Sequence, residues 1–314
     1  MEKGKSMSMR YAFIINPTAG KGVMQEGITE SIKEYFKDST DEYIIHITTH
    51  RGDAEETARE LASSGEKIKI FACGGEETVY EVLNGIVGFE NASLGVIPCG
   101  SANDFLKFFD DKQKFLDLSS QIKGEETCVD LIKAGDRYCL NGCSVGMDAM
   151  VANDMSLFKR WPFVSGRLAY KLAIVKTFLR KLGVNIDITL DGDKPFNSNC
   201  LFAVVANAPY YGGGYMAAPS AVPYDNKLNF TLVKKISRFR VPKFLSLYSK
   251  GKHEKLGYCE NSECESMQFV CKKSIPVNLD GEIVEANSMK FEIVKGALNF
   301  VIPVGVKAKL FTKS

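Results

Sequence analysis

The chain has 314 residues, of which 25% are charged and 45% hydrophobic, and its formal net charge is +2 at pH 7. This length suits two domains, and the composition is that of a globular protein with an ample core. The small net charge argues against a general nucleic-acid-binding protein, and no apolar run reaches the ~18 residues of a membrane span. Nine cysteines without a CxxC pair and the lack of a signal-peptide core predict a cytoplasmic protein.

The first part of the chain alternates strands and helices. We expect strands at 11–15, 43–48, 68–73 and 94–97, and helices at 25–36, 51–64, 78–87 and from about residue 101. Asp53 is the expected N-cap of the second helix, because Glu56 follows at the capping-box spacing. This alternation predicts a mainly parallel, Rossmann-like sheet with its ligand site at the carboxyl ends of the strands.

The pattern of expected helices and strands changes after about residue 128. Helical stretches are expected near 148–182 and 241–249, and short β-rich segments at 129–133, 138–144, 184–190, 201–207, 227–234, 267–271, 275–279 and 289–294. We therefore expect an α/β domain at 1–128 and an antiparallel β-sandwich at 129–297. The last strand, at 298–303, could belong to either domain. If it joins the first, residues 298–314 complete the α/β domain.

Three loops rich in small residues follow strand ends in the first domain. The first, 16–22, lacks the spacing of a Walker A loop. The second, 74–78, joins a strand to a helix and can present backbone N–H groups to a phosphate. In the third, 98–105, Ser101 can cap a helix. Each loop alone has an ordinary explanation as a turn or a cap, but three at successive strand ends favour a ligand site.

Together the loops resemble the diacylglycerol kinase catalytic-domain family. Asn16-Pro17-x-Ala19-Gly20-Lys21 is similar to its nucleotide loop, residues 74–85 to its GGDGT-xx-EV-xNG motif and residues 94–105 to its LGxIPxGTxNDF motif. Further matches lie at 129–130, 141–148, 211–219 and 279–282. The resemblance therefore runs in order from about residue 10 to 305.

The resemblance implies a phosphofructokinase-like α/β domain, a β-sandwich and an active site in the cleft between them. It also implies ATP- and Mg²⁺-dependent phosphorylation of a lipid hydroxyl, usually that of diacylglycerol, which yields phosphatidic acid. By the match, the nucleotide-binding residues are Asn16, Gly20, Lys21, Gly74, Gly75, Glu76, Thr78, Gly100, Ser101 and Asn103.

The resemblance further implies acidic side chains with separate roles. Glu76, Asp104 and Asp130 would form the cluster near the metal, and Asp225 is the nearest match to a structural Mg²⁺ site in the second domain. Asp280 and Glu282 would carry the base, and we favour Glu282. A hairpin turn is the ordinary reading of Asp280-Gly281.

The second loop departs from the family pattern, because Glu76-Glu77 stand in place of Asp-Gly. If Glu77 occupies a position that needs φ > 0, we expect weak ATP affinity or no turnover. Two alternatives therefore stay open: a non-catalytic relative that binds lipid or nucleotide, and a kinase for another lipid alcohol.

A diacylglycerol substrate lies in a bilayer, so membrane contact is expected. The segment 159–163 joins Lys159 and Arg160 to Trp161 and Phe163, and a second basic stretch contains Lys234, Lys235, Arg238, Arg240 and Lys243. These segments favour peripheral contact with the inner face of a membrane. The expected partner is a lipid substrate and not a nucleic acid, and a homodimer stays open.

Overall fold

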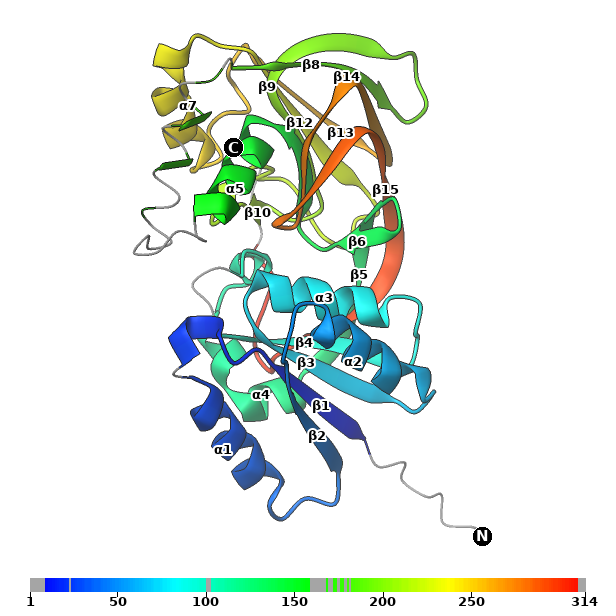
Figure 1. The fold of residues 1–314 in the computed structure, drawn as a ribbon. Coiled ribbons are helices and arrows are strands. Elements are labelled where there is room, and N and C mark those ends of the chain that lie inside the picture. Colours follow the sequence, from blue (N-terminus) through cyan, green and yellow to red (C-terminus); the bar gives the residue numbers. More distant parts are fainter. Residues whose placement is uncertain are drawn as a thin grey trace. The chain divides into compact units, whose positions relative to one another are not determined.

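The computed structural model describes residues 9–22, 24–99, 103–158, 168, 172–173, 176–177, 180 and 182–309. Contacts divide the chain into two compact units. The first combines the residues up to Val129 with Gly296–Lys309, and the second runs from Asp130 to Lys295. The expected fold class is confirmed, since the first unit is α/β and the second is an antiparallel β-sandwich (Figure 1).

The first unit is built on a parallel sheet. Its strands are β1 (Arg10–Ile15), β2 (Glu42–Ile47), β3 (Ile68–Gly74) and β4 (Ala92–Pro98), in the order β2-β1-β3-β4. The end of β15 (Glu282–Ile302) adds to this sheet, because Asn299 and Phe300 pair in parallel with Ser93 and Leu94 of β4. A segment from the far end of the sequence therefore completes the first unit.

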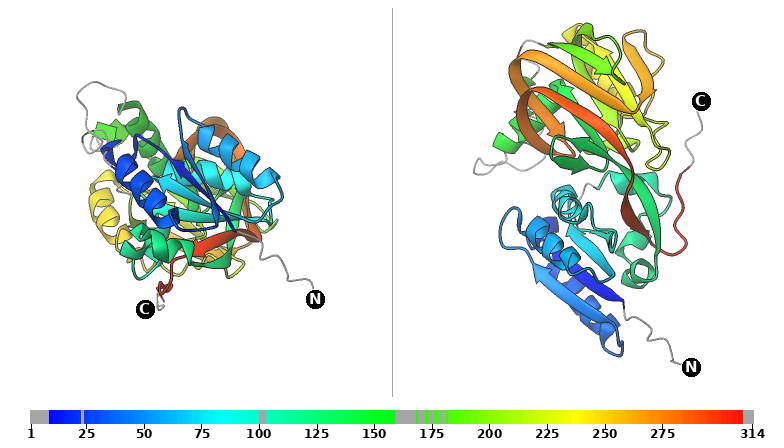
Figure 2. Two further views of the ribbon diagram at one scale, coloured as in Figure 1. Left: turned by 90° about the horizontal axis from the view of Figure 1, so that it is seen from below. Right: turned by 90° about the vertical axis from the view of Figure 1, so that its right-hand side faces the viewer.

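Helices cover both faces of this sheet (Figures 1 and 2). On one face, α1 (Met24–Phe36) and α4 (Leu118–Ile122) pack on buried side chains that include Phe13 and Phe71. On the other face lie α2 (Asp53–Ser63) and α3 (Glu76–Ile86). These two helices approach closely at Gly85, where an added Cβ would stand 2.5 Å from the carbonyl oxygen of Glu55.

The predicted N-cap of the second helix is wrong. Gly52, not Asp53, caps α2, and the Asp53 carboxylate instead accepts hydrogen bonds from Thr49 and contacts His46. The helix expected from about residue 101 would begin outside the described residues, and the chain that follows forms a short 3₁₀ helix, η2 (Phe105–Phe108). Two further 3₁₀ helices are η1 (Ala19–Gly22) and η3 (Gln113–Leu116).

The second unit is an antiparallel sandwich in which β9 is central. Its strands and helices are the second half of β5 (Glu125–Ala134), β6 (Arg137–Cys139), β7 (Gly142–Gly146), α5 (Met147–Phe158), β8 (Val184–Leu190), β9 (Phe196–Ala206), β10 (Tyr210–Tyr211), β11 (Tyr215–Met216), β12 (Leu228–Lys234), η4 (Arg238–Arg240), α7 (Val241–Tyr248), β13 (Cys259–Cys264), β14 (Ser266–Leu279) and most of β15. Strand β9 pairs with β7, β8 and β12, and β14 pairs with β7, β8 and β15.

Several predicted strands have different bounds. The predicted strand 138–144 is two strands, β6 and β7, whereas the segments predicted at 267–271 and 275–279 are one strand, β14, with an irregularity between Val270 and Ile275. Strand β13 was not predicted, because four of its six residues are exposed and polar. Among the described residues, no helix is both long and apolar enough to cross a membrane.

Candidate active site

The loop after β1 contacts the loop after β3. Asn16 Nδ2 donates to Thr78 Oγ1 at 3.3 Å, and the backbone N–H of Asn16 donates to the carbonyl of Cys73 at 3.0 Å. Asn16 Oδ1 accepts hydrogen bonds from the backbone N–H and the hydroxyl of Thr18, so the Asn16 side chain also stabilises the loop to which it belongs. The chain then turns at Gly20, whose φ is 60°. Two of the predicted nucleotide loops therefore meet at the carboxyl ends of neighbouring strands.

The loop after β3 is shaped by its glycines. A Cβ on Gly74 would lie 2.2 Å from Thr78 Oγ1, so only glycine allows this tight turn onto α3. Gly75 is the N-cap of α3 in an extended conformation, and a Cβ there would meet nothing within 4 Å. The first N–H groups of α3 are therefore offered at the strand end, in the arrangement that binds phosphate.

Glu77 does not have the strained backbone that its position suggested. It lies in the first turn of α3 and is not among the described residues with positive φ. Its side chain is 58% exposed, with a carboxylate oxygen 3.9 Å from Arg51 Nε. A negative charge in the first turn of a helix is favourable. The φ > 0 condition on which we expected weak affinity is therefore not met.

The loop after β4 contacts the loop after β3. Asn103 Nδ2 donates to the carbonyl of Gly74 at 3.4 Å, and the N–H of Asp104 donates to Glu76 Oε1 at 3.0 Å. Asn103 has a φ of 126°, and its buried Oδ1 has no hydrogen-bond partner. Glu76, Asn103 and Asp104 thus lie together. Gly100, Ser101 and the side chain of Lys21 lie outside the described residues.

Three lysines that the sequence analysis missed surround these acidic groups. Lys107 pairs with Asp104, and Lys309 Nζ donates to the carbonyl of Lys107 at 2.9 Å. Burial lowers the pKa of Lys112, which Lys107 and Lys309 lower further while Asp104 and Glu76 raise it. Lys107 follows Asp104 at helical spacing and could have been noticed, whereas Lys309 arrives from the far end of the chain.

In the second unit, Asp280 anchors a loop. Asp280 and Gly281 form the two-residue turn between β14 and β15, with φ values of 51° and 101°. The Asp280 carboxylate accepts the backbone N–H groups of Leu140, Asn141 and Gly142. Glu282 begins β15 and is partly exposed. The Asp280 carboxylate is therefore held by this loop.

Asp130 and Asp225 lie near each other in the second unit. Asp130 is 2% exposed and accepts the N–H of Asn226 at 2.7 Å, and Asp225 accepts the N–H of Lys227 at 3.0 Å. Burial raises the pKa of Asp225, and the charges of Asp130 and Glu263 add to this effect. Within the described part of the chain, no three His, Cys, Asp or Glu side chains are grouped to hold a metal. The structural Mg²⁺ site therefore stays a prediction.

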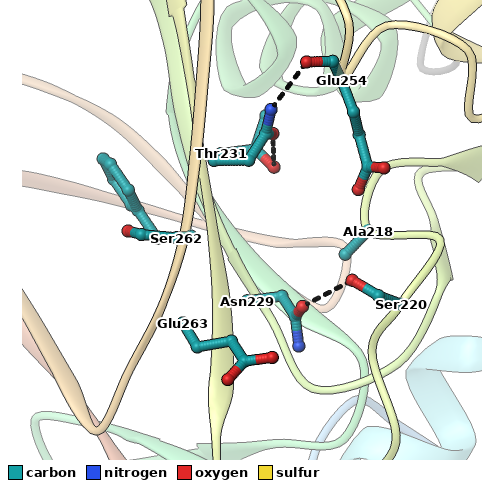
Figure 3. Close-up of a pocket in the computed structure, with 9 residues that line it drawn as sticks. Ala218, Ser220, Asn229, Thr231, Glu254, Ser262 and Glu263 are labelled. Carbon is teal, nitrogen blue, oxygen red and sulfur yellow. Dashed lines mark hydrogen bonds between the residues drawn. The ribbon is translucent and has the colours of Figure 1, made fainter. Parts of the chain in front are cut away.

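A polar pocket lies elsewhere in the second unit, beside β12 and β13 (Figure 3). Ser220 Oγ donates to Asn229 Oδ1 at 3.1 Å on one side, and Thr231 Oγ1 donates to Asn261 Oδ1 at 3.0 Å on the other. Glu254 and Glu263 lie at its border. None of the predicted site residues lines this pocket. The segment 159–163, where we expected membrane contact, lies outside the described residues.

Comparison with known proteins fits both units. The family description "Diacylglycerol kinase catalytic domain" matches residues 10–134, and "YegS C-terminal NAD kinase beta sandwich-like domain" matches residues 141–302. The chain is 30% identical over 293 residues to "Putative lipid kinase YtlR" of Bacillus subtilis, covering 87% of this chain and 93% of that protein. It is 26% identical to the "Diacylglycerol kinase" of the same organism, covering 87% and 89% of the two chains.

Solved structures agree on the fold. A crystal structure of "a putative diacylglycerol kinase from Bacillus anthracis" superposes with a TM-score of 0.75 at 24% identity, covering 96% of this chain and 99% of that one. Yeast NADH kinase superposes with a TM-score of 0.51 at 11% identity, covering 96% and 84%. Fold and sequence together define a family of kinases that combine an α/β domain with a β-sandwich. The chain belongs to the diacylglycerol kinase catalytic-domain family, in its bacterial lipid kinase branch.

Proposed function

We propose that this chain is an active, ATP-dependent lipid kinase that phosphorylates the free hydroxyl of diacylglycerol to give phosphatidic acid. The observation that carries the proposal is the meeting of the three loops, through the hydrogen bonds Asn16–Thr78, Asn103–Gly74 and Asp104–Glu76. Phosphoryl transfer depends mainly on positioning and charge neutralisation, and the meeting of the loops supports the positioning role.

The first unit would bind the nucleotide. The N-terminal N–H groups of α3 would receive phosphate oxygens, while Lys107, Lys112 and Lys309 would balance their negative charge. Asn16 and Thr78 would position the nucleotide beside them. The loop that joins β4 to η2 would complete the site, with Gly100 and Ser101 as the residues that the family match proposes.

The side chains beside the third loop suit a hard cation. Glu76 and Asp104 offer carboxylate oxygens, and Asn103 offers a buried amide oxygen that has no partner. Mg²⁺ prefers oxygen ligands of this kind, so we propose that these three residues hold it. When bound, Mg²⁺ would neutralise charge on the phosphates.

Glu282 would act as the general base. It would take the proton of the lipid hydroxyl as the hydroxyl oxygen bonds to the γ-phosphorus, and ADP would leave with the electrons of the broken P–O bond. Asp280 suits this role less, because its carboxylate already accepts three backbone N–H groups. We therefore assign Asp280 to positioning.

Transfer of labelled phosphate from ATP to diacylglycerol in non-ionic detergent micelles tests the proposal. We expect Mg²⁺-dependent turnover, reduced about 10²–10⁴-fold in Glu282→Gln. Glu285→Gln is the matched control, because Glu285 is an exposed glutamate on the same strand, and it should retain activity. If Glu285→Gln lost as much activity as Glu282→Gln, the assignment of the base would be wrong.

A second candidate function is non-catalytic binding of lipid or nucleotide. The two glutamates that replace Asp-Gly favour it, as does the engagement of Asp104 by Lys107. This candidate function predicts that the wild type binds ATP but phosphorylates no lipid, and that Glu77→Gly gains turnover. Turnover with another lipid alcohol and none with diacylglycerol would instead change the substrate.

A further inference from the structure

The turn before α7 exposes a phenylalanine between two arginines. Phe239 is 86% exposed, far more than any other large hydrophobic side chain among the described residues, of which the next is 49% exposed. It is the middle residue of η4, and Arg238 and Arg240 stand on either side of it in the sequence. A single exposed apolar residue needs no explanation, so the surroundings of Phe239 decide what it means.

Positive charge is concentrated around this turn. Eight basic residues and one acidic residue, Glu254, lie between positions 234 and 255, although the rest of the chain has more Asp and Glu than Lys and Arg. The basic residues are Lys234, Lys235, Arg238, Arg240, Lys243, Lys250, Lys252 and Lys255. In the described part of the chain, Lys234 pairs with Glu260, but no acidic oxygen lies within 4.0 Å of the side-chain nitrogens of Lys235, Arg240 or Lys243.

These charges are unfavourable for the fold. Helix α7 begins at Val241, has no acidic residue in its first turn and has no side-chain cap. Arg238 and Arg240 precede it and Lys243 lies in its first turn, so cations face the positive end of the helix dipole. Phe239 also adds nothing to the core, unlike Phe244 three residues into the helix, which is fully buried. Arg238 Nη2 donates to the carbonyl of Arg180 at 3.3 Å and so has a structural role, but folding explains neither Arg240 nor the exposed Phe239.

We propose that η4 and the start of α7 form a docking surface for an anionic lipid bilayer, with Phe239 entering the interfacial region. We call Arg238, Phe239, Arg240 and Lys243 the docking turn. Cations beside a protruding aromatic ring fit such a surface, because the ring partitions into the lipid while the cations attract acidic headgroups. This inference rests on the proposed function, since a diacylglycerol kinase must reach a substrate that lies in a bilayer.

Sedimentation of the full chain with lipid vesicles, without nucleotide, tests the proposal. We expect binding to phosphatidylcholine vesicles that contain about a third phosphatidylglycerol and little binding to phosphatidylcholine alone. Phe239→Ala should weaken binding roughly tenfold. Phe196→Ala is the matched control, because Phe196 is also an exposed phenylalanine, at 37%, and lies outside the basic region; it should bind as the wild type does.

Charge is tested separately. The double variant Arg240→Gln, Lys243→Gln should weaken binding by about fivefold for each charge removed, and raised salt should weaken wild-type binding in the same way. The matched control is the double variant Lys37→Gln, Lys290→Gln, since both of these lysines are exposed and lie outside the docking turn. Equal binding to neutral and anionic vesicles would overturn the proposal, as would wild-type binding by Phe239→Ala.

Two further measurements separate this proposal from other outcomes. Phe239→Ala should keep wild-type turnover in detergent micelles, where no anionic surface has to be found. If the wild type is inactive in micelles yet binds anionic vesicles through Phe239, the proposed function fails and the docking surface stands. Binding of the basic region to an oligonucleotide, with no binding to anionic vesicles, would overturn the docking surface in favour of a nucleic acid.

Discussion

Single residues decide how the Glu76-Glu77 substitution is understood. The sequence places a larger, charged residue where the family has glycine, and this suggested a strained backbone beside a polyphosphate. In the structure Glu77 has an ordinary helical backbone, and its carboxylate lies near Arg51. Glu76 accepts the N–H of Asp104, so it links the second loop to the third. Both glutamates therefore have a structural explanation that is compatible with activity.

The substitution Glu77→Gly should lower stability without being needed for turnover. Glycine in a helix costs about 1 kcal/mol relative to good helix formers, and a favourable charge in the first turn is lost as well. We expect the free energy of unfolding in urea to fall by about 1–2 kcal/mol. Glu77→Gln separates the two effects, because it removes the charge and keeps the backbone preference. An increase in stability of Glu77→Gly would contradict this view.

His253 should give stability a dependence on pH. Its side chain is fully buried, with Nε2 3.1 Å from the carbonyl of Ala217 and its ring 4.5 Å from that of Tyr248. Burial lowers the pKa of His253 from 6.5 to about 4, although the contact with Ala217 opposes this shift. Between these two values the unfolded chain binds a proton that the folded chain does not, so stability falls as the pH is lowered.

The expected loss between pH 6.5 and 4 is up to about 3 kcal/mol. Urea unfolding across this range measures it, and His253→Gln should remove this part of the pH dependence even if it lowers stability overall. His50→Gln is the control, because the side chain of His50 is 61% exposed. An unchanged pH slope in His253→Gln would show that another group titrates.

At the scale of elements, the β14–β15 hairpin does more than reverse the chain. The carboxylate of its turn residue Asp280 accepts three consecutive N–H groups, those of Leu140 and Asn141 between β6 and β7 and that of Gly142 at the start of β7. The same hairpin begins β15 with Glu282. A turn that the sequence explains by local preference alone is thus fixed by contacts more than a hundred residues away, which local patterns cannot reveal.

Asp280→Asn should therefore destabilise the protein. The amide nitrogen that replaces one carboxylate oxygen would face backbone donors, at a cost of about 1–3 kcal/mol. Glu282→Gln is the counterpart, since it should reduce turnover about 10²–10⁴-fold and lower the free energy of unfolding less than Asp280→Asn does. Urea unfolding of both variants, with the micelle assay, distinguishes the two roles. Equal stability of Asp280→Asn and wild type would remove the positioning role.

The elements of the first unit were easier to predict than those of the second. Strands β1, β3 and β4 are buried apolar segments with glycine, proline or polar residues at their ends, so composition locates them. In the second unit, β13 is exposed and polar, and β14 and β15 are long strands whose polar residues look like turns. Their pairing, and not their composition, makes them strands.

The candidate site was predictable to the extent that it is made of short motifs. The loops at Asn16, Gly74 and Asn103 were located from glycines and polar residues at strand ends. The lysine cluster was not, because Lys309 joins Lys107 across 202 positions of the sequence. The positive φ of Asn103 was equally hidden, since it depends on the surrounding loop.

At the scale of the whole molecule, β15 belongs to both units. Its first part pairs with β14, and its end pairs with β4. Gly296, with a φ of 56°, lies where the assignment changes from the second unit to the first. The strand therefore needs a residue that tolerates a left-handed backbone at this position.

Gly296→Val should lower the free energy of unfolding by about 1–2 kcal/mol, because a β-branched residue resists positive φ. Gly296→Asn should cost less, since asparagine adopts this conformation more readily. An added Cβ would stand 3.9 Å from Cys128 Cβ, so crowding does not account for the difference. If the two variants were equally stable, backbone conformation would not be the reason for glycine.

The contribution of β15 to the first sheet has a consequence for biosynthesis. While the ribosome is producing the second unit, β4 has already been made, but its partner, residues 299 and 300, has not. One edge of the early sheet then stays open, and open strand edges promote aggregation. The first unit can reach its final form only after residues 299 and 300 have emerged, so a nascent chain of this protein is expected to depend on chaperones until these residues have been made.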